Sequence, residues 1–310
     1  MKILGIESSH DDTSISLVEN LDVIIHLKIS QVDIHKKYGG TIPEIASREH
    51  YNNFYILLEE LKKQFDLNDL DYISYTEEPG FIGALQMGKL FAHSLSKTLK
   101  KPLIPINHLD GHIYSVLLDN ENKITYPAIA LIASGGHTNL YLLNSKEDKK
   151  IIGQTIDDAI GEVFDKVSRI LFNVFPGGPY IDQIFDSKFN NAQIYKLNDA
   201  KLKNNPFDFS FSGYKTQIFN MSKNENIDKE LLACSFQKQV IDFIISKTKL
   251  AIETFNPKTI ILSGGVSANK YLRQEFLKLH KNALIPKLEY ATDNGAMIAA
   301  AAFEKLKNKN

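Results

Sequence analysis

The sequence has little cysteine, no tryptophan and no long apolar run. Its 310 residues include 1 Cys and 0 Trp. One cysteine excludes an internal disulfide framework and a cysteine-rich zinc ribbon. No apolar stretch approaches the roughly 20 residues of a membrane-spanning helix, and the N-terminal MKILGIESSHDD becomes acidic too early for a secretory signal. We therefore expect a cytoplasmic protein without a membrane partner.

The chain also has almost no net charge. It carries 36 Lys+Arg against 37 Asp+Glu, a formal charge of −1. Proteins that bind nucleic acid by bulk electrostatics normally show an excess of basic residues. A nucleic-acid partner would therefore have to be held by a local patch or with the help of other subunits.

Predicted strands and helices alternate along the chain, which indicates an α/β fold with a mixed sheet. The length and the 43% of hydrophobic residues suggest about two domains. The predicted strands are Ile3–Ile6, Ser14–Val18, Val23–Ile29, Asp71–Tyr75, Pro102–Ile106, Pro127–Ala133, Leu140–Leu143 and Thr259–Leu262. The predicted helices are Pro43–Phe65, Ala84–Leu99, Ile160–Phe172, Leu231–Phe255, Lys270–Lys281 and Asn294–Leu306.

One pattern recurs: an apolar strand that runs into a small, polar, glycine-containing turn. It occurs at Ile3–Ser9, Ile129–Thr138 and Ile260–Ser267. Ligands of open α/β sheets bind beyond the carboxyl ends of strands, so the repeat suggests two related halves that face a common cleft. This organisation is similar to that of the actin/Hsp70/sugar-kinase superfamily. We expect one lobe at 1–125 and another at 126–310, with the last helix (294–307) packing back on the N-terminal lobe.

His108 and His112 form the sharpest candidate for chemistry. If a helix follows the strand that ends at Ile106, the two histidines lie on one helical face, at the spacing that lets two imidazoles share a metal ion. Two polar residues at a helix start are the simpler alternative. A zinc peptidase would have Glu directly after the first His, and here Leu109 stands in that place.

Two histidines leave a metal ion incompletely coordinated, so a carboxylate from elsewhere is expected. Asp293, in the string ATDNGAM, is the best candidate. An aspartate before an alanine-rich helix is also an ordinary N-cap. The sequence leaves both roles open.

Three further strings suit a bound nucleotide or a cap. The turn Ser134–Gly135–Gly136–His137–Thr138 offers unshielded backbone N–H groups that fit a phosphate, or it is a tight hairpin. The string DDAIGEVFDK places carboxylates, among them Glu162 and Asp165, at a helix start. Asp182 follows the rigid turn FPGGPYI, where it can bind ribose hydroxyls or cap a helix.

The segment Phe207–Thr216 interleaves aromatic rings, hydroxyls and a lysine. Together with the lysines between residues 194 and 223, it forms a locally basic stretch whose rings could stack on RNA bases. A half-buried strand with a polar edge explains the same pattern equally well.

Taken together, these strings resemble the TsaD family, whose members were once labelled glycoprotein endopeptidases. The similarity runs almost end to end and in the family's order, through GIESSHDDTS, YGGTIPEIASREH, NHLDGHI, ASGGHT, DDAIGEVFDK, FPGGPYID, FDFSFSGYKT, LSGGVSANKYLR and ATDNGAMIA. The resemblance implies an actin-like (ASKHA) two-lobed fold with duplicated mixed-sheet domains. It also implies transfer of a threonylcarbamoyl group from threonylcarbamoyl-adenylate to N6 of the adenosine beside the anticodon of tRNAs reading codons that begin with A, forming t6A.

The resemblance also assigns residues and partners. It implies a divalent metal ion, with Fe²⁺ favoured and Zn²⁺ as an alternative, on His108, His112 and Asp293. Contacts to the adenylate are implied for Ile132, Ala133, Ser134, Gly135, Gly136, Asp165, Gly178, Asp182 and Asn269. Additional candidates for the cleft are Glu7, His10, Asp11 and Glu162. A smaller paralogous TsaB-type subunit and a TsaE-type ATPase are the implied protein partners, beside tRNA.

The sequence departs from the family at His10, where a cysteine is usual; a thiol has no role here, and the imidazole is a candidate for an extra metal ligand. No covalent nucleophile is required, because the adenosine amine can attack the mixed anhydride directly. An ATPase or small-molecule kinase of the same fold is the main alternative. A metallopeptidase is a weaker one, and it would need Glu7 or Glu162 as its base.

Overall fold

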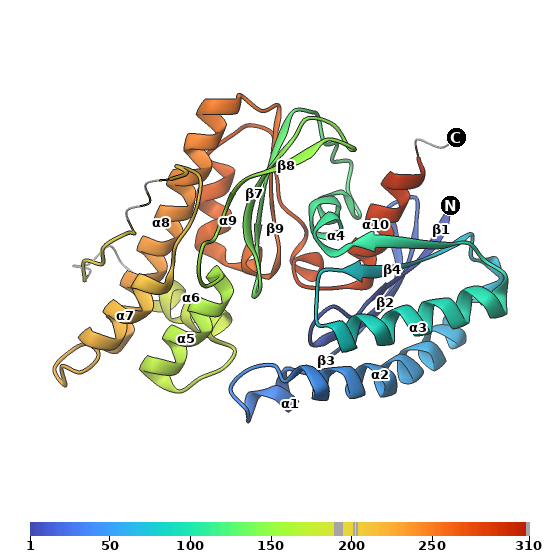
Figure 1. The fold of residues 1–310 in the computed structure, drawn as a ribbon, viewed down its shortest axis with the longest axis horizontal. Helices are drawn as coiled ribbons and strands as arrows, with labels where there is room; N and C mark the ends of the chain where they lie inside the picture. Colours follow the sequence, from blue (N-terminus) through green and yellow to red (C-terminus); the bar gives the residue numbers. More distant parts are fainter. Residues whose placement is uncertain (189–194, 201, 203, 308–310) are drawn as a thin grey trace. The chain divides into compact units, whose positions relative to one another are not determined.

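The computed structural model describes residues 1–188, 195–200, 202 and 204–307. They form two compact units (Figure 1). Unit 1 consists of Met1–Lys123 together with Pro286–Asn310, and unit 2 is Ile124–Ile285. Unit 2 is therefore inserted into the chain of unit 1. None of the helices formed by the described residues is long and apolar enough to cross a membrane.

Unit 1 contains the first strands and helices of the chain and its last helix. Its strands are β1 (Lys2–Glu7), β2 (Asp12–Glu19), β3 (Asp22–Ser30), β4 (Tyr72–Glu78) and β5 (Leu103–Asn107). Its helices are α1 (Val32–Lys36), α2 (Pro43–Gln64), α3 (Ile82–Leu99), α4 (His108–Tyr114) and α10 (Gly295–Leu306), with short 3-10 turns η1 (Leu67–Asp69), η2 (Ser115–Leu117) and η4 (Leu288–Tyr290).

The sheet of unit 1 has the order β3-β2-β1-β4-β5 and helices on both faces (Figure 1). Neighbouring residues of a strand point to opposite faces. Leu4 and Ile6 accordingly pack with Phe54 and Leu57 of α2, whereas Ile3 packs with the alanine-rich helix α10. Both faces are buried, which explains why β1 is apolar throughout.

A close approach of two glycines fixes α10 against β1. A Cβ atom on Gly5 would lie 1.9 Å from the carbonyl oxygen of Gly295. The backbone N–H of Gly295 donates to Ser14 Oγ on β2 at 3.0 Å. The turn that precedes α10 is therefore held against the middle of the sheet.

Unit 2 contains the other strands and helices. Its strands are β6 (Ala128–Ala133), β7 (Thr138–Leu143), β8 (Lys149–Gln154), β9 (Thr259–Ser263) and β10 (Ala283–Leu284). Its helices are α5 (Ile160–Phe172), α6 (Gly177–Lys188), α7 (Ser212–Met221), α8 (Lys229–Phe255) and α9 (Lys270–Leu277), with the 3-10 turn η3 (Gly265–Ala268).

The two sheets have the same plan. In unit 2 the order is β10-β9-β6-β7-β8. The central strand pairs antiparallel with the strand that follows it and parallel with a later one, as β6 does with β7 and β9 and β1 does with β2 and β4. The duplication that the glycine turns suggested is thus visible in strand order and direction. The turn after β9 is equivalent to the one after β4, not to the one after β1.

The aromatic rings of 207–216 belong to the core of unit 2. Phe209, Phe211 and Tyr214 are 0%, 0% and 1% exposed. They pack with helix α8, where Phe211 and Tyr214 meet Phe243 and Phe236 edge to face. The prediction that these rings stack on RNA bases is wrong, because burial in the core stabilises them there. Lys201 and Lys203 of the same basic stretch lie outside the described residues.

Candidate metal site and nucleotide-binding residues

Helix α4 begins directly after β5 and presents both histidines on one face. The side chain of Asn107 caps the helix, with Oδ1 accepting from the N–H of Leu109 at 3.0 Å. The rings of His108 and His112 have centroids 4.7 Å apart, as the four-residue spacing on a helix predicts. Both side chains are buried, with residue exposures of 5% and 0%.

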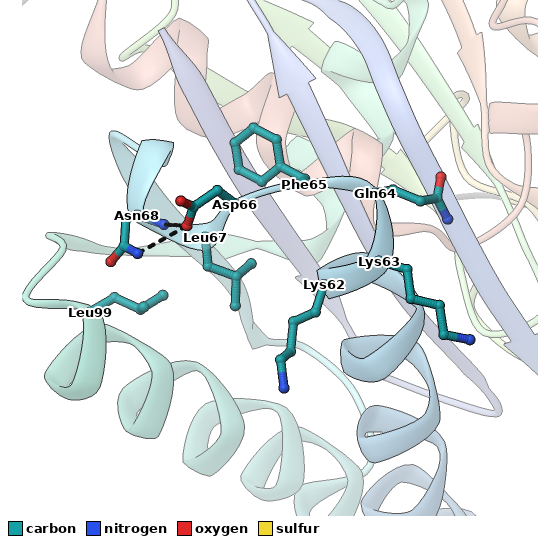
Figure 2. A pocket seen from close by; sticks show the side chains of 8 residues that line it. All are labelled: Lys62, Lys63, Gln64, Phe65, Asp66, Leu67, Asn68 and Leu99. Carbon is teal, nitrogen blue, oxygen red and sulfur yellow. Dashed lines mark hydrogen bonds between the residues drawn. The ribbon is translucent and has the colours of Figure 1, made fainter.

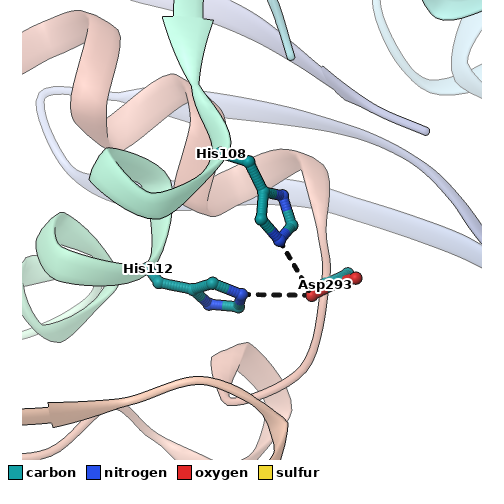
Figure 3. A group of neighbouring side chains, drawn as sticks. All are labelled: His108, His112 and Asp293. Carbon is teal, nitrogen blue, oxygen red and sulfur yellow. Dashed lines mark ion pairs between the residues drawn. The ribbon is translucent and has the colours of Figure 1, made fainter. Parts of the chain in front are cut away.

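Asp293 completes a three-residue group with these histidines (Figure 3). Its Oδ1 lies 3.6 Å from Nε2 of His108 and 3.2 Å from Nε2 of His112. The three ligand atoms lie within 4.8 Å of one another. Asp293 does not cap α10, because Asn294 Oδ1 accepts the N–H of Met297 at 2.9 Å. Of the two roles that the sequence left open for Asp293, the N-cap role belongs to its neighbour.

The donor set fits a divalent cation. Within the described chain, Nδ1 of His112 is buried and has no hydrogen-bond partner, which is costly, and its buried Nε2 has only the Asp293 carboxylate beside it, at 3.2 Å. Burial lowers the pKa of His112, so its imidazole is neutral. Burial would raise the pKa of Asp293, but the neighbouring histidines hold it well below the usual range. Neutral imidazole and ionised carboxylate are the forms that bind metals.

Glu7 and Ser9 contact Nδ1 of His108, the ring nitrogen on the side away from Asp293. The carboxylate of Glu7 is fully buried, and its Oε2 lies 3.1 Å from Nδ1 of His108. Thr76 Oγ1 and the N–H of Ser9 donate to the same carboxylate, each at 2.5 Å. Burial alone would lower the pKa of His108, but Glu7 and Asp293 raise it to about 9. A carboxylate on Nδ1 directs Nε2 of the ring toward Asp293, the arrangement typical of metal-bound histidine.

His10 and Asp11 form a pair of their own in unit 1. His10 Nδ1 lies 2.7 Å from Asp11 Oδ1, and the imidazole stacks on Phe81 at 4.4 Å between centroids. Burial opposes protonation, but Asp11 raises the pKa of His10. The group of three ligands in the described chain does not include His10.

In unit 2, the predicted nucleotide contacts begin at the turn after β6. Ser134 and His137 close a tight hairpin, with Ser134 N–H donating to the carbonyl of His137 at 2.8 Å. Gly135 and Gly136 are exposed at its tip. Ile132 and Ala133 are buried strand residues, which leaves only their backbone for a ligand. The turn is both the hairpin and a loop of accessible N–H groups.

A chain of contacts leads from this turn through α5 and α6 to α9. The N–H of Gly161, at the start of α5, donates to the carbonyl of Ser134 at 3.2 Å. Asp165 Oδ1 accepts from Gly177 N–H at 2.6 Å, beside Gly178 at the start of α6. A Cβ atom on Gly178 would meet nothing within 4 Å. Gly178 therefore lies in the first turn of α6, where anions bind, whereas Asp165 lies in the second turn of α5.

Asp182 closes the path by joining α6 to α8 and α9. Its carboxylate accepts from Gln237 Nε2 at 2.8 Å, Asn269 Nδ2 at 2.9 Å and the N–H of Lys270 at 3.1 Å. Burial raises its pKa. Gly264, after β9, has a φ of +89°, and a Cβ atom there would lie 2.4 Å from the carbonyl oxygen of Ala133. The turns after β6 and β9 therefore touch each other, and hydrogen bonds link Asp165 to the start of α6 and Asp182 to Asn269.

Glu162 is the predicted residue with the least restrained position. Its side chain is 47% exposed and pairs with Lys166 at 2.7 Å. Asp158 also pairs with Lys166, at 2.9 Å. Two carboxylates at the start of α5, those of Asp158 and Glu162, are therefore ion-paired with Lys166.

A surface hollow of about 590 Å³ lies at the end of α2 in unit 1 (Figure 2). Its walls include Lys62, Lys63, Phe65 and Leu99. Asp66 Oδ1 accepts from the backbone and side-chain nitrogens of Asn68 there, at 3.0 and 2.9 Å. None of the predicted site residues lines this hollow, so it lies outside the proposed chemistry.

Sequence reasoning missed the residues that support the ligands. Ser9, Thr76 and Lys28 contact Glu7, His108 or the Asp293 turn, but they lie far from the ligands in the sequence. Asn294 was open to prediction, because asparagine is a strong N-cap.

Known sequences similar to this chain all belong to one family in the comparisons that follow. The model of the TsaD family, described as tRNA N6-adenosine threonylcarbamoyltransferase, matches residues 22–300. A protein of that name from Mycoplasmopsis agalactiae is 52% identical over 314 residues, covering 100% of both chains. Another, from Mycoplasma mobile, is 55% identical over 307 residues and covers 99% of both.

Two solved structures show the same fold at low sequence identity. HypF in a phosphate- and nucleotide-bound form has a TM-score of 0.63 at 14% identity, with 99% of this chain and 46% of that chain covered. The (R)-2-hydroxyglutaryl-CoA dehydratase component A of Acidaminococcus fermentans has a TM-score of 0.58 at 12% identity, with 99% of each covered. With the two equivalent mixed sheets, these likenesses confirm the expected actin-like fold of two domains.

Proposed function

We propose, since the chain belongs to the TsaD family, that it transfers a threonylcarbamoyl group to N6 of an adenosine in tRNA and uses a metal ion held by His108, His112 and Asp293. The protein is an acyltransferase that forms t6A on tRNA. The finer assignments are that the donor is threonylcarbamoyl-adenylate and that the acceptor lies beside the anticodon of tRNAs for codons beginning with A.

The observation that carries the metal assignment is the buried triad itself. Three side chains of ligating type converge, and Nε2 of the buried His112 faces Asp293 Oδ1 at 3.2 Å. A bound divalent ion would supply a Lewis acid for the acyl donor. Fe²⁺ is our first assignment, with Zn²⁺ as the alternative, because two histidines and one carboxylate suit both ions.

The residues of unit 2 are proposed to bind the adenylate. Accessible N–H groups of Gly135 and Gly136 suit its phosphate. Asp182 and Asn269 already contact each other at 2.9 Å, and they are assigned to the ribose hydroxyls. Asp165 and Gly178 are assigned to the same ligand. No covalent intermediate is needed, because holding donor and acceptor in place replaces a bimolecular encounter.

The transfer is balanced without a further reactant. The N6 amine attacks the carbamoyl carbon, and a C–N bond forms while the C–O bond to the adenylate phosphate breaks. AMP leaves, and the amine loses one proton. The chain's contribution is to hold the donor phosphate, exclude competing water and orient the two imidazoles through Glu7 and the start of α4.

The test is to incubate the protein with threonylcarbamoyl-adenylate and unmodified tRNA and to measure t6A by mass spectrometry. We propose a TsaB-type subunit and a TsaE-type ATPase as partners in the cytoplasm, so the assay is run with and without them. No t6A in any combination would refute the proposed reaction.

His112→Ala is the matched variant for the metal ion. We expect at least about a tenfold loss of metal affinity and loss of t6A formation, whereas His93→Ala, which alters an exposed histidine of unit 1, leaves both unchanged. A kinase of the same fold would keep its activity in His112→Ala and would release ADP from ATP.

A further inference from the structure

Lys28 on β3 reaches the turn that carries the third metal ligand. Its ammonium group donates to Thr292 Oγ1 at 2.9 Å and to the backbone carbonyl of Asp293 at 3.0 Å. On its other side it pairs with Asp12 Oδ2 at 2.5 Å. An ammonium group has three donors, so these contacts use all of them.

The ion pair beneath this contact is largely buried. The side chains of Lys28 and Asp12 are 23% and 14% exposed. Asp12 Oδ1 is buried and has no hydrogen-bond partner in the described part of the chain. Lys28 is therefore the cation that compensates the Asp12 carboxylate, and Asp12 in turn fixes the position of the ammonium group.

The contact holds the turn without competing for the ligand atom. Lys28 donates to the backbone oxygen of Asp293, whereas Oδ1 of Asp293 faces His108 and His112. The residues after Asp293 have separate anchors: Asn294 caps α10, and Gly295 N–H donates to Ser14. Lys28 is the charged anchor of the ligand-bearing residue itself.

We propose that Lys28 is a positioning residue that fixes the 292–293 turn so that the Asp293 carboxylate reaches both histidines. The inference rests on the metal site under "Proposed function". Without Lys28, the turn samples other conformations, and the metal ion must bear the free-energy cost of ordering it. Metal affinity falls, while the two histidines on α4 remain in place.

The test measures metal binding by the full-length protein after the metal has been removed. The Zn²⁺ dissociation constant is obtained by competition with a chromophoric chelator, so the readout does not depend on activity. We expect Lys28→Met to bind Zn²⁺ about 10- to 100-fold more weakly, the range for residues that support metal ligands. Lys28→Arg keeps the charge and restores most of the affinity.

Lys305→Met is the matched control. Lys305 also donates to a backbone carbonyl of unit 1, that of Pro105 at 3.0 Å, but it lies in the last turn of α10, at the opposite end of the helix from the 292–293 turn. Its loss leaves the dissociation constant unchanged. In the t6A assay, Lys28→Met regains most of the wild-type kcat at saturating metal, with an unchanged KM for the adenylate.

The outcomes separate this inference from the proposed function. The metal site itself is wrong if the wild-type protein does not bind Zn²⁺, or if His112→Ala binds Zn²⁺ as tightly as the wild type. If it binds Zn²⁺ and Lys28→Met binds equally well, the metal site stands and the role of Lys28 is overturned. If circular dichroism shows that Lys28→Met does not fold, Thr292→Val is measured instead. It removes only the neutral contact of Lys28 with Thr292, so we expect a smaller loss of Zn²⁺ affinity, and an unchanged affinity would overturn the role of Lys28.

Discussion

Glu7 contacts His108, one of the proposed metal ligands, and determines which nitrogen of its ring is free. It holds Nδ1 at 3.1 Å, which leaves Nε2 for the metal ion. The residue is fully buried, so its carboxylate has no role as an exposed base in the free protein. The metallopeptidase alternative thereby loses one of the two carboxylates that could have served it.

Glu7→Gln is predicted to weaken metal binding. The amide keeps the shape but removes the charge that makes His108 a more basic ligand and holds its Nδ1, so the dissociation constant rises by about 10- to 100-fold. The measurement is again Zn²⁺ competition. Glu59→Gln, on the exposed face of α2, serves as the control. Equal affinities for Glu7→Gln and wild type would contradict the orienting role.

Gly5→Ala is predicted to be strongly destabilising. Its Cβ atom would lie 1.9 Å from the carbonyl oxygen of Gly295 and 2.8 Å from the nitrogen of Ala299. Both are backbone atoms, so α10 must move, and we expect a loss of about 3 kcal/mol or more in the free energy of unfolding. Chemical denaturation measures it.

Gly40→Ala is the control for this substitution, since its Cβ atom would meet nothing within 4 Å. We expect the free energy of unfolding of Gly40→Ala to stay within about 1 kcal/mol of wild type. A Gly5→Ala protein as stable as Gly40→Ala would show that α10 can shift freely.

Among the elements, the segment before α7 is held by one carboxylate. Asp157 accepts from Ser210 Oγ at 2.6 Å, Phe211 N–H at 2.8 Å and Ser212 Oγ at 2.7 Å. Burial opposes ionisation, but these donors lower the pKa of Asp157. The aromatic core residues Phe209 and Phe211 are thereby tied to the segment that precedes α5.

Asp157→Asn should cost about 1–2 kcal/mol of stability at neutral pH, an estimate that allows for solvent screening of a partly exposed group. Because the folded-state pKa is lowered, the stabilisation by Asp157 is complete above the ordinary carboxyl pKa and is lost as the pH falls through the folded value. The difference between the denaturation midpoints of variant and wild type should therefore be constant at neutral pH and begin to shrink below about pH 4. A pH-independent difference would contradict this account.

Elements with strong periodicity were predicted well, and those set by tertiary contacts were not. Helix α5 agrees with the prediction at both ends, Ile160 and Phe172, because its apolar face repeats over several turns. Helix α7 was missed: Ser212–Met221 follows alternating aromatics that look like a strand. Strand β8 was missed as well, since Lys149–Gln154 is mostly exposed and its pairing with β7 comes from the sheet.

The candidate site followed the same division. His108 and His112 were identifiable because their spacing is local, and helix α4 brings them together. Asp293 follows His112 by about 180 residues, and the two meet because the chain returns to unit 1 and packs α10 against β1. The sequence left Asp293 open between a metal ligand and an N-cap, and the family resemblance is what favoured the ligand.

For the whole molecule, the two sets of functional residues belong to different units. The proposed metal ligands lie in unit 1, and the proposed adenylate contacts lie in unit 2. A ligand that binds only the folded state stabilises the part that it contacts, by about 2.7 kcal/mol at 100 times its dissociation constant. Zn²⁺ should therefore slow hydrogen exchange in α4 and α10, and AMP should slow it in α5, α6 and α9.

Hydrogen exchange monitored by mass spectrometry measures both effects in one protein. His112→Ala should remove the effect of Zn²⁺ and keep that of AMP, whereas Asp182→Ala should do the reverse. Protection of unit 2 alone by Zn²⁺, or of unit 1 alone by AMP, would contradict the assignment of the two sites.

The insertion of unit 2 into unit 1 also sets an order of events during synthesis. When the ribosome adds residue 285, unit 2 has been synthesised in full, but unit 1 still lacks Asp293 and helix α10. Domains generally begin to fold while the chain is still emerging. The sheet of unit 1 is therefore completed only when α10 has been made. A protein truncated between residues 285 and 293 would contain all of unit 2 but would lack Asp293 of the proposed metal site.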